Sequence, residues 1–222
     1  MQASRTLQPT RVGEVVIRGA PVTHGYWADT KSTSSAIDSA GWLRTGDLGW
    51  FDSKGQLMLC GRRKDMIKSG GENIHASEVE SALAAVVGVQ EAAVVAVPHV
   101  RYGEAVAALL CVRPHAEAAC GTSAQGAECS IWANVTGNMA GGWGVHELVV
   151  LEGDALALLQ ASLRRGGLTG FKVPQTVVVS QQPVPRTQTG KLDKRAVKIF
   201  LSKLTAPGES SEQAGAWLRS AL

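Results

Sequence analysis

The sequence lacks a long apolar run, has few aromatic residues and contains no dense basic cluster. No apolar stretch reaches the ~20 residues that a membrane-spanning helix needs, so we expect no membrane span. Aromatic residues make up 5% of the 222 residues, and the net charge of +3 comes from basic residues spread along the chain. This combination argues against a nucleic-acid partner. The N-terminus has no apolar segment behind a basic start, so we expect no signal peptide.

Cysteine is also scarce, and its spacing does not indicate a metal site. The four cysteines, none of which belongs to a C-x-x-C pair, are Cys60, Cys111, Cys120 and Cys129. The first two lie in strand-like apolar runs, so we expect buried, reduced thiols. The other two have histidines nearby, but their spacing fits no standard zinc pattern. We therefore expect no resident metal ion and an intracellular location, in the cytoplasm, a plastid or a peroxisome.

The first third of the chain has the pattern of short strands and turns. Residues 13–19 are a short β run bounded by glycines, and residues 42–51 and 56–61 predict two further strands. Residues 52–55 between them are typical of a hairpin turn. No helical periodicity is found before residue 75. We therefore expect residues 1–63 to form a β-rich piece.

The pattern changes from residue 64 onward to a mixture of helices and strands. Ser77 and Glu80 form a capping-box pattern ahead of apolar residues at helical spacing. Asp154 and Asp193 are candidate N-caps of two later helices. Three apolar runs predict strands, at residues 91–97, 105–112 and 176–180. The order predicts an α+β domain over residues 64–205, with helices covering a three-stranded sheet.

Two segments do not fit this plan. Residues 113–150 are rich in alanine, glycine and serine and have no sustained period, so we expect a low-complexity insertion there. Residues 206–222 are polar, and we expect a flexible tail. The predicted organisation is therefore a β-rich part, an α+β domain with an insertion, and a tail.

The first motif with a chemical interpretation is the Thr45-Gly46-Asp47 triplet. A carboxylate can accept hydrogen bonds from two vicinal hydroxyls, such as those of a ribose. Gly46 leaves the approach to Asp47 free of a side chain. The alternative is an ordinary turn aspartate, because this triplet is common. Taken alone, the motif favours the turn aspartate.

The second motif covers residues 61–74 and contains a charged stretch followed by a glycine-rich turn. Arg62 offers a planar fork of donors that suits a ribose or a phosphate. Gly70 and Gly71 allow a positive φ and a close approach of the backbone to a thin ligand. The alternative is a solvated basic turn before a helix, and the motif alone favours that alternative.

The third motif is the Gly190-Lys191 step within residues 185–192, just before a predicted helix. A lysine beside a glycine in a loop of small residues can move its charge onto a phosphate. A lysine packed along a helix has less freedom to do so. The sequence therefore makes Lys191 a candidate phosphate-contacting residue.

Together the three motifs resemble those of the adenylate-forming acyl-CoA synthetase family, the AMP-binding enzymes. The resemblance covers residues 12–112 and 151–203 and includes the Phe171-Lys172-Val173-Pro174 run. Within the family, the sequence is similar to 2-succinylbenzoate–CoA ligases and ligases of small aryl acids. Medium- or long-chain fatty acids and coumarate-like acids remain alternative substrates.

The resemblance implies a two-step ligase reaction. A small carboxylic acid attacks the α-phosphate of ATP, which enters with Mg²⁺, and gives an acyl-adenylate and diphosphate. The thiol of coenzyme A then displaces AMP. By this resemblance Asp47 would hold the ribose hydroxyls, Arg62 would assist at the nucleotide, and Lys191 would stabilise charge at the reacting carboxylate and α-phosphate. No tightly bound cofactor is expected.

The resemblance also implies a moving lid. Lys64 would be the hinge between a large N-terminal domain and the C-terminal lid domain. Rotation of the lid would present Lys191 in the first step and a CoA-facing turn in the second. That turn consists of four residues, Lys68, Ser69, Gly70 and Gly71.

Several features of the family do not occur in this sequence. The serine-, threonine- and glycine-rich phosphate loop and most of the acid pocket are absent. We therefore expect the β-rich remnant of a large domain followed by a complete lid, and an acid–thiol ligase fragment that is inactive without the missing N-terminal domain. The alternative is a free-standing lid-like module that binds or regulates without turnover.

Overall fold

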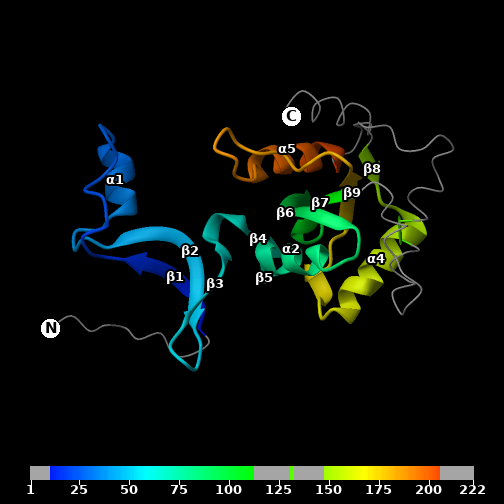
Figure 1. Cartoon of the computed structure of the whole chain (residues 1–222), viewed down its shortest axis with the longest axis horizontal. Helices are drawn as coiled ribbons and strands as arrows, with labels where there is room; N and C mark the ends of the chain where they lie inside the picture. Colours follow the sequence, from blue (N-terminus) through cyan, green and yellow to red (C-terminus); the bar gives the residue numbers. More distant parts are fainter. Residues whose placement is uncertain (1–10, 113–130, 133–147, 206–222) are drawn as a thin grey trace. The chain divides into compact units, whose positions relative to one another are not determined.

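The structure, a computed structural model, describes residues 11–112, 131–132 and 148–205. The chain divides into two compact units, Met1–Met66 and Ile67–Leu222 (Figure 1). Most of the expected insertion and the whole expected tail lie outside the described residues. Within the described ranges, no helix is long and apolar enough to cross a membrane.

The first unit contains a three-stranded antiparallel sheet in the order β1-β2-β3. Its strands are β1 (Gly13–Ile17), β2 (Leu43–Phe51) and β3 (Leu57–Arg62). The turn between β2 and β3 is closed by Asp52, whose carboxylate accepts from the amides of Lys54 and Gln56 at 2.9 and 2.8 Å. The three strands and this turn confirm the sequence predictions for this part.

A short helix in the first unit was not predicted. Helix α1 (Thr30–Ala36) begins after Asp29, whose side chain accepts from the amide of Ser32 at 2.8 Å. Hydrogen bonds from the side chain and then the backbone of Ser32 hold the pKa of Asp29 below its ordinary value. The helix buries none of its residues, so it has no apolar stripe for periodicity to detect. The prediction of no helix before residue 75 was therefore wrong.

The second unit is built on a six-stranded sheet, twice the predicted number of strands. The strand order is β5-β4-β7-β9-β8, with β6 also paired to β7. The strands are β4 (Met66–Ser69), β5 (Glu72–His75), β6 (Val89–His99), β7 (Gly103–Val112), β8 (Leu148–Val150) and β9 (Thr176–Ser180). The three predicted strands correspond to β6, β7 and β9. The other three were missed because runs of three or four residues are too short to show alternation.

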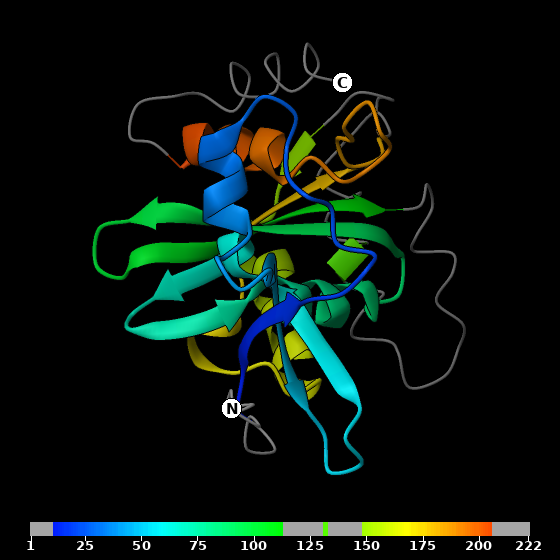
Figure 2. The same ribbon diagram turned by 90° about the vertical axis from the view of Figure 1, so that its left-hand side faces the viewer.

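Helices cover both faces of this sheet (Figures 1 and 2). They are α2 (Ala76–Ala84), α4 (Gly153–Arg165) and α5 (Lys194–Leu204). In β6, Val94 and Ala96 join the core that contains residues of α2 and α4, whereas Ala93, Val95 and Val97 join the core that contains residues of α5. The strand is buried on both sides, which explains why its sequence is continuously apolar.

The helix N-termini match the predicted caps in one case of three. Asp193 accepts from the amide of Ala196 at 3.0 Å and caps α5, as predicted. Helix α4 begins after Glu152, so Asp154 lies in its first turn. Helix α2 begins after His75, and the Ser77–Glu80 capping box is wrong.

Tertiary contacts explain the failure of this capping box. The carboxylate of Glu80 accepts from the amide of Val94 in β6 at 2.9 Å and lies 2.7 Å from the ammonium group of Lys194. The charge-assisted contacts with other elements replace the local bond to the helix start. The same glutamate therefore links α2, β6 and α5.

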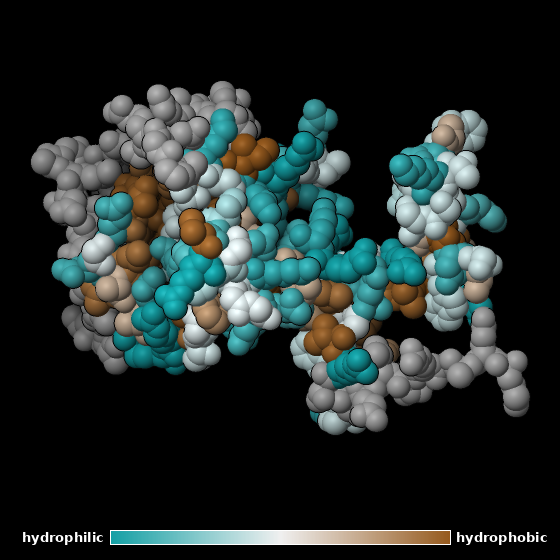
Figure 3. All heavy atoms as spheres, turned by 180° about the vertical axis from the view of Figure 1, so that it is seen from behind, coloured by the Kyte–Doolittle hydropathy of each residue, from teal (hydrophilic) through white to brown (hydrophobic). Residues whose placement is uncertain are grey.

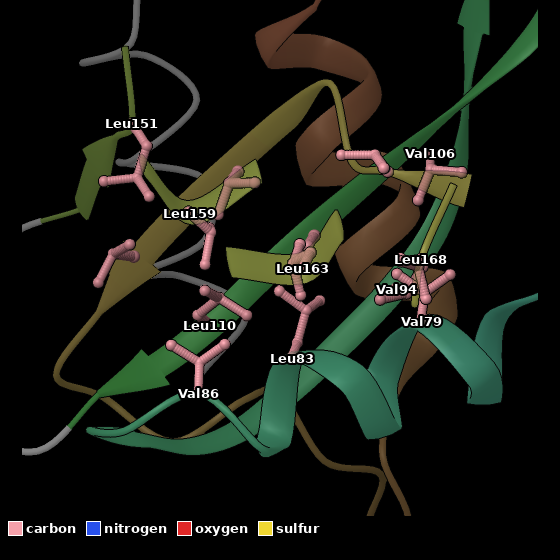
Figure 4. Packing of buried hydrophobic residues seen from close by; sticks show 14 of the residues in the cluster. Val79, Leu83, Val86, Val94, Val106, Leu110, Leu151, Leu159, Leu163 and Leu168 are labelled. Atoms are coloured by element: carbon pink, nitrogen blue, oxygen red, sulfur yellow. The ribbon is translucent and has the colours of Figure 1, made fainter. Parts of the chain in front are cut away.

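We expect the substitution Leu83→Ala to lower the free energy of unfolding by about 2–5 kcal/mol, because the residue is fully buried in the α2–α4 core (Figure 4). Urea denaturation followed by circular dichroism measures this loss. The matched control is Ile199→Ala on α5, where the side chain is 38% exposed. Equal losses in the two variants would contradict this description of the core.

Candidate functional site

Asp47 and Arg62 are brought together by the pairing of β2 with β3. They are direct partners in the antiparallel register, and Arg62 Nε lies 3.3 Å from Asp47 Oδ1. The hydroxyl of Thr45 donates to the carbonyl of Val15 at 2.8 Å and accepts from the amide of Asp47 at 3.0 Å. The two predicted nucleotide-contacting residues therefore form one ion pair on a hydrogen-bonded sheet.

An open hollow lies beside this pair within the first unit. Its volume is about 430 Å³, and its lining includes Gly46, Glu14, Arg44 and Arg63. The guanidinium groups of both arginines lie 3.9 Å from Glu14 Oε2. Gly46 has a φ of +77°, so its conformation favours glycine, and a side chain there would meet nothing within 4 Å. The hollow has the size of a small-ligand site and a charged, polar lining.

The proposed hinge residue, Lys64, lies in a single 3-10 turn. This turn, η1 (Arg63–Asp65), follows β3 directly and leads into an extended Met66. Lys64 is exposed, and the division between the two compact units falls two residues later. The position suits a pivot, and the pivoting itself stays a prediction.

The predicted CoA-facing turn connects β4 to β5 in the second unit. Gly70 and Gly71 have φ values of +58° and +88°, in the left-handed region that favours glycine. Lys68 and both glycines are exposed, whereas Ser69 is 1% exposed. The Ser69 hydroxyl finds no hydrogen-bond partner among the described residues. Sequence reasoning placed all four residues on one ligand-facing turn, and the structure places three of them at the surface.

Aromatic side chains pack against this turn, and the sequence analysis did not predict this packing. The amide of Gly70 donates to the carbonyl of Tyr102 at 3.1 Å, and a Cβ on Gly70 would lie 2.8 Å from the ring of Phe171. The Tyr102 and Phe171 rings meet edge to face at 5.0 Å, and the ring of His99 stacks on Tyr102 at 4.7 Å. The first glycine is thus required by packing as well as by backbone conformation.

The Gly190-Lys191 loop is a closed backbone turn immediately before α5. The amide of Thr187 donates to the carbonyl of Lys191 at 2.7 Å, and the amide of Gly190 donates to the carbonyl of Thr187 at 2.8 Å. Gly190 has a φ of +78°. The Lys191 residue is exposed. Lys191 is therefore an exposed lysine on a loop whose backbone is held by hydrogen bonds.

The two candidate catalytic segments of the second unit lie well apart. Figure 2 shows the β4–β5 hairpin in teal and the loop before α5 in orange at different sides of this unit. The β4–β5 turn and the Lys191 loop are therefore two separate surfaces of this unit.

The two cysteines among the described residues form no disulfide; Cys111 is buried, as expected, whereas Cys60 is only partly buried. Burial raises the pKa of the Cys60 thiol. Burial, followed by the nearby charge of Glu91, raises the pKa of the Cys111 thiol. Neither is therefore tuned as a nucleophile. The described parts of the chain contain no group of three or more histidine, cysteine, aspartate or glutamate side chains arranged to hold a metal ion.

The sequence of residues 78–140 matches the family described as AMP-binding enzyme C-terminal domain. This part of the chain therefore belongs to the C-terminal domain of the AMP-binding enzymes. It is 33% identical over 202 residues to an indoleacetate–CoA ligase of Aromatoleum aromaticum, covering 90% of this chain and 31% of the relative. It is 34% identical over 194 residues to the 2-succinylbenzoate–CoA ligase, chloroplastic/peroxisomal, of Arabidopsis thaliana, covering 85% and 30%.

Solved structures of AMP-binding enzymes show the same fold. ATP-bound MatB from Rhodopseudomonas palustris aligns with a TM-score of 0.65 and 26% identity, covering 90% of this chain and 32% of that chain. An o-succinylbenzoate CoA synthetase (MenE) from Bacillus subtilis, in complex with its acyl-adenylate intermediate, aligns with a TM-score of 0.61 and 26% identity, covering 89% and 32%. These comparisons confirm the family resemblance and the mixed α and β fold. This chain spans less than a third of the full length of these four AMP-binding proteins.

We expect Gly70→Ala to destabilise the protein by about 1–3 kcal/mol more than Gly71→Ala. Both substitutions strain a positive φ, but only the first also drives a methyl group into the Phe171 ring. Urea denaturation of the two variants measures the difference. If the second variant were equally destabilised, the ring would not be the constraint on the turn.

Proposed function

We propose that this chain supplies the lid of an AMP-forming carboxylic acid–CoA ligase, together with the adjoining strands of its large domain. The observation that supports this most directly is the pair of separated segments on the second unit. One segment is the hydrogen-bonded loop that carries Lys191. The other is the β4–β5 turn, which carries Gly70 and Gly71 and packs against the Phe171 ring. The family's two chemical steps need two such surfaces.

In the first step, Lys191 acts as the electrostatic catalyst. Its ammonium group neutralises charge that develops as the substrate carboxylate attacks the α-phosphate of ATP. Asp47 accepts hydrogen bonds from the ribose hydroxyls, and Arg62, already 3.3 Å from it, holds that carboxylate and assists at the nucleotide. Mg²⁺ enters with ATP.

In the second step, the lid turns about Lys64 and presents the β4–β5 turn to the pantetheine arm of CoA. The two exposed glycines leave the backbone open to a thin chain. The thiol then attacks the acyl carbonyl of the adenylate and AMP leaves. Ser69 is buried, so in this proposal its side chain does not contact the ligand.

We assign the substrate to the aromatic and other cyclic carboxylic acids. The names of the relatives support this assignment, since they include an indoleacetate–CoA ligase and several 2-succinylbenzoate–CoA ligases. The relatives also include long-chain-fatty-acid–CoA ligases, so fatty acids form the competing class. A panel of acids in the adenylation assay below separates the two classes.

The first unit has an exposed apolar surface that an adenylating domain would cover. The first unit exposes many large apolar side chains, which Figure 3 shows as brown patches. They include Val16, Ile17, Phe51, Leu57, Met58 and Leu59, each between 41% and 62% exposed. Exposed apolar patches commonly mark a surface that another domain or chain covers. We therefore propose that the chain alone is inactive, and that it is not a free-standing binding module.

The test is a graft of the full 222-residue chain behind the adenylating portion of the indoleacetate–CoA ligase. We expect this graft to catalyse acid-dependent ATP–diphosphate exchange, and the chain alone to show none. In the graft, Lys191→Ala should reduce exchange roughly 100- to 1,000-fold and spare thioester formation from supplied acyl-adenylate.

The control for this test is Lys54→Ala, which removes an exposed lysine from the β2–β3 turn. We expect both half-reactions to keep the rates of the unaltered graft in this variant. Loss of both half-reactions to the same degree in Lys191→Ala would overturn the assigned role.

Lys64→Pro should slow thioester formation roughly tenfold while adenylation changes little, because proline restricts the backbone that must turn between the steps. Separate single-turnover assays of the two half-reactions measure this. Unchanged overall turnover would show that the pivot lies elsewhere.

A further inference from the structure

A carboxylate on the central sheet reaches the loop that contains Lys191. Glu91 lies near the start of β6, directly after a register irregularity between Val89 and Glu91. Such irregularities re-aim side chains at the ends of strands. Here the Glu91 carboxylate accepts from the amide of Val184 at 3.2 Å and forms an ion pair with Arg186. One rigid strand thus holds two points of the segment that leads to Lys191.

Arg186 extends this connection to the residue beside Lys191. One of its terminal nitrogens, Nη2, contacts Glu91, while the other, Nη1, donates to the carbonyl of Gly190 at 3.0 Å. The planar guanidinium group makes both contacts at once, which an ammonium group at one point could not do. The carboxylate of the sheet is therefore joined to the peptide bond between Gly190 and Lys191.

Both carbonyls that flank the Lys191 side chain are consequently occupied. The carbonyl of Gly190 accepts from Arg186, and the carbonyl of Lys191 accepts from the amide of Thr187 at 2.7 Å. With both peptide planes held, the Cα–Cβ direction of Lys191 is defined. The side chain then departs from a set point even though it is exposed.

We infer that Arg186 and Glu91 are positioning residues that fix the backbone on both sides of Lys191. The ordering of the loop depends on contacts in this unit alone. Its consequence for catalysis rests on the proposed function, since it assumes that Lys191 acts in adenylation. A small displacement of a charge-stabilising group is costly in rate, although an exposed ion pair contributes little to stability.

The first experiment measures order in the 222-residue chain itself. Hydrogen exchange by NMR follows the amides of Thr187 and Gly190, both donors within the loop. In Arg186→Gln and in Glu91→Gln we expect these amides to exchange roughly tenfold faster, while the amides of β9 keep their rates. Arg186→Lys should accelerate exchange as much as Arg186→Gln, because it keeps the positive charge but loses the planar guanidinium group that makes both contacts.

The matched control is Glu78→Gln on α2. Glu78 forms an ion pair with Lys172 at 2.7 Å in the same unit, and the pair is about as exposed as the Glu91–Arg186 pair. Among the described residues, Glu78 has no hydrogen bond or ion pair with residues 185–192. We expect no faster exchange at the loop amides in this variant. Unchanged exchange in the Arg186 and Glu91 variants, or equal acceleration in the control, would overturn the inference.

The second experiment tests the catalytic consequence in the grafted ligase described above. Arg186→Gln should lower the adenylation kcat roughly tenfold, leave the KM for ATP within about twofold, and spare thioester formation from supplied acyl-adenylate. Faster loop exchange with a normal adenylation kcat would overturn the positioning role. If the unaltered graft shows no adenylation, the proposed function fails. The exchange rates alone then decide whether Arg186 and Glu91 order the loop.

Discussion

The rest of the second unit depends on the burial of one sheet on both faces. Strands β6, β7 and β9 alternate their side chains between two cores, one shared with α2 and α4 and the other with α5. Because β7 pairs with β6 on one edge and with β9 on the other, it cannot shift register without moving its apolar residues from one core to the other. The sheet therefore provides a fixed frame. The β4–β5 turn and the Lys191 loop are both attached to this sheet.

Three glutamates attach the surrounding segments to this frame in the same way. Each carboxylate accepts a hydrogen bond from one backbone amide and forms an ion pair with one basic side chain from the C-terminal part of the chain. Glu80 contacts the Val94 amide and Lys194, Glu91 contacts the Val184 amide and Arg186, and Glu104 contacts the Lys68 amide and Lys198, the last at 3.8 Å. Such bonds are directional, so they specify position more than they add stability. Segments far apart in sequence are thereby placed with respect to the same strands.

The sequence predicted the long elements and missed the short or locally polar ones. Strands β6, β7 and β9 were predicted because continuous apolar runs indicate burial on both faces. Helix α1 was missed because it buries nothing, and strands β4, β5 and β8 because they are too short for a period. The capping box failed because Glu80 satisfies an amide in β6 instead of one at its own helix start. A contact with another element outweighed the local signal in the capping box, whereas α1 and the short strands gave no periodic signal to detect.

The candidate site shows the same division between sequence and tertiary structure. The chemical types of Asp47, Arg62 and Lys191, and the glycines beside them, were readable in the sequence because charge and backbone freedom are local properties. Their partners were not, because these come from residues distant along the chain. Strand pairing joins Asp47 to Arg62, the Phe171 ring accounts for the lack of a side chain at Gly70, and Glu91 reaches the lysine loop across 95 positions to Arg186. The sequence by itself determined which groups are available and which family they belong to, and only the folded sheet decided how each is held.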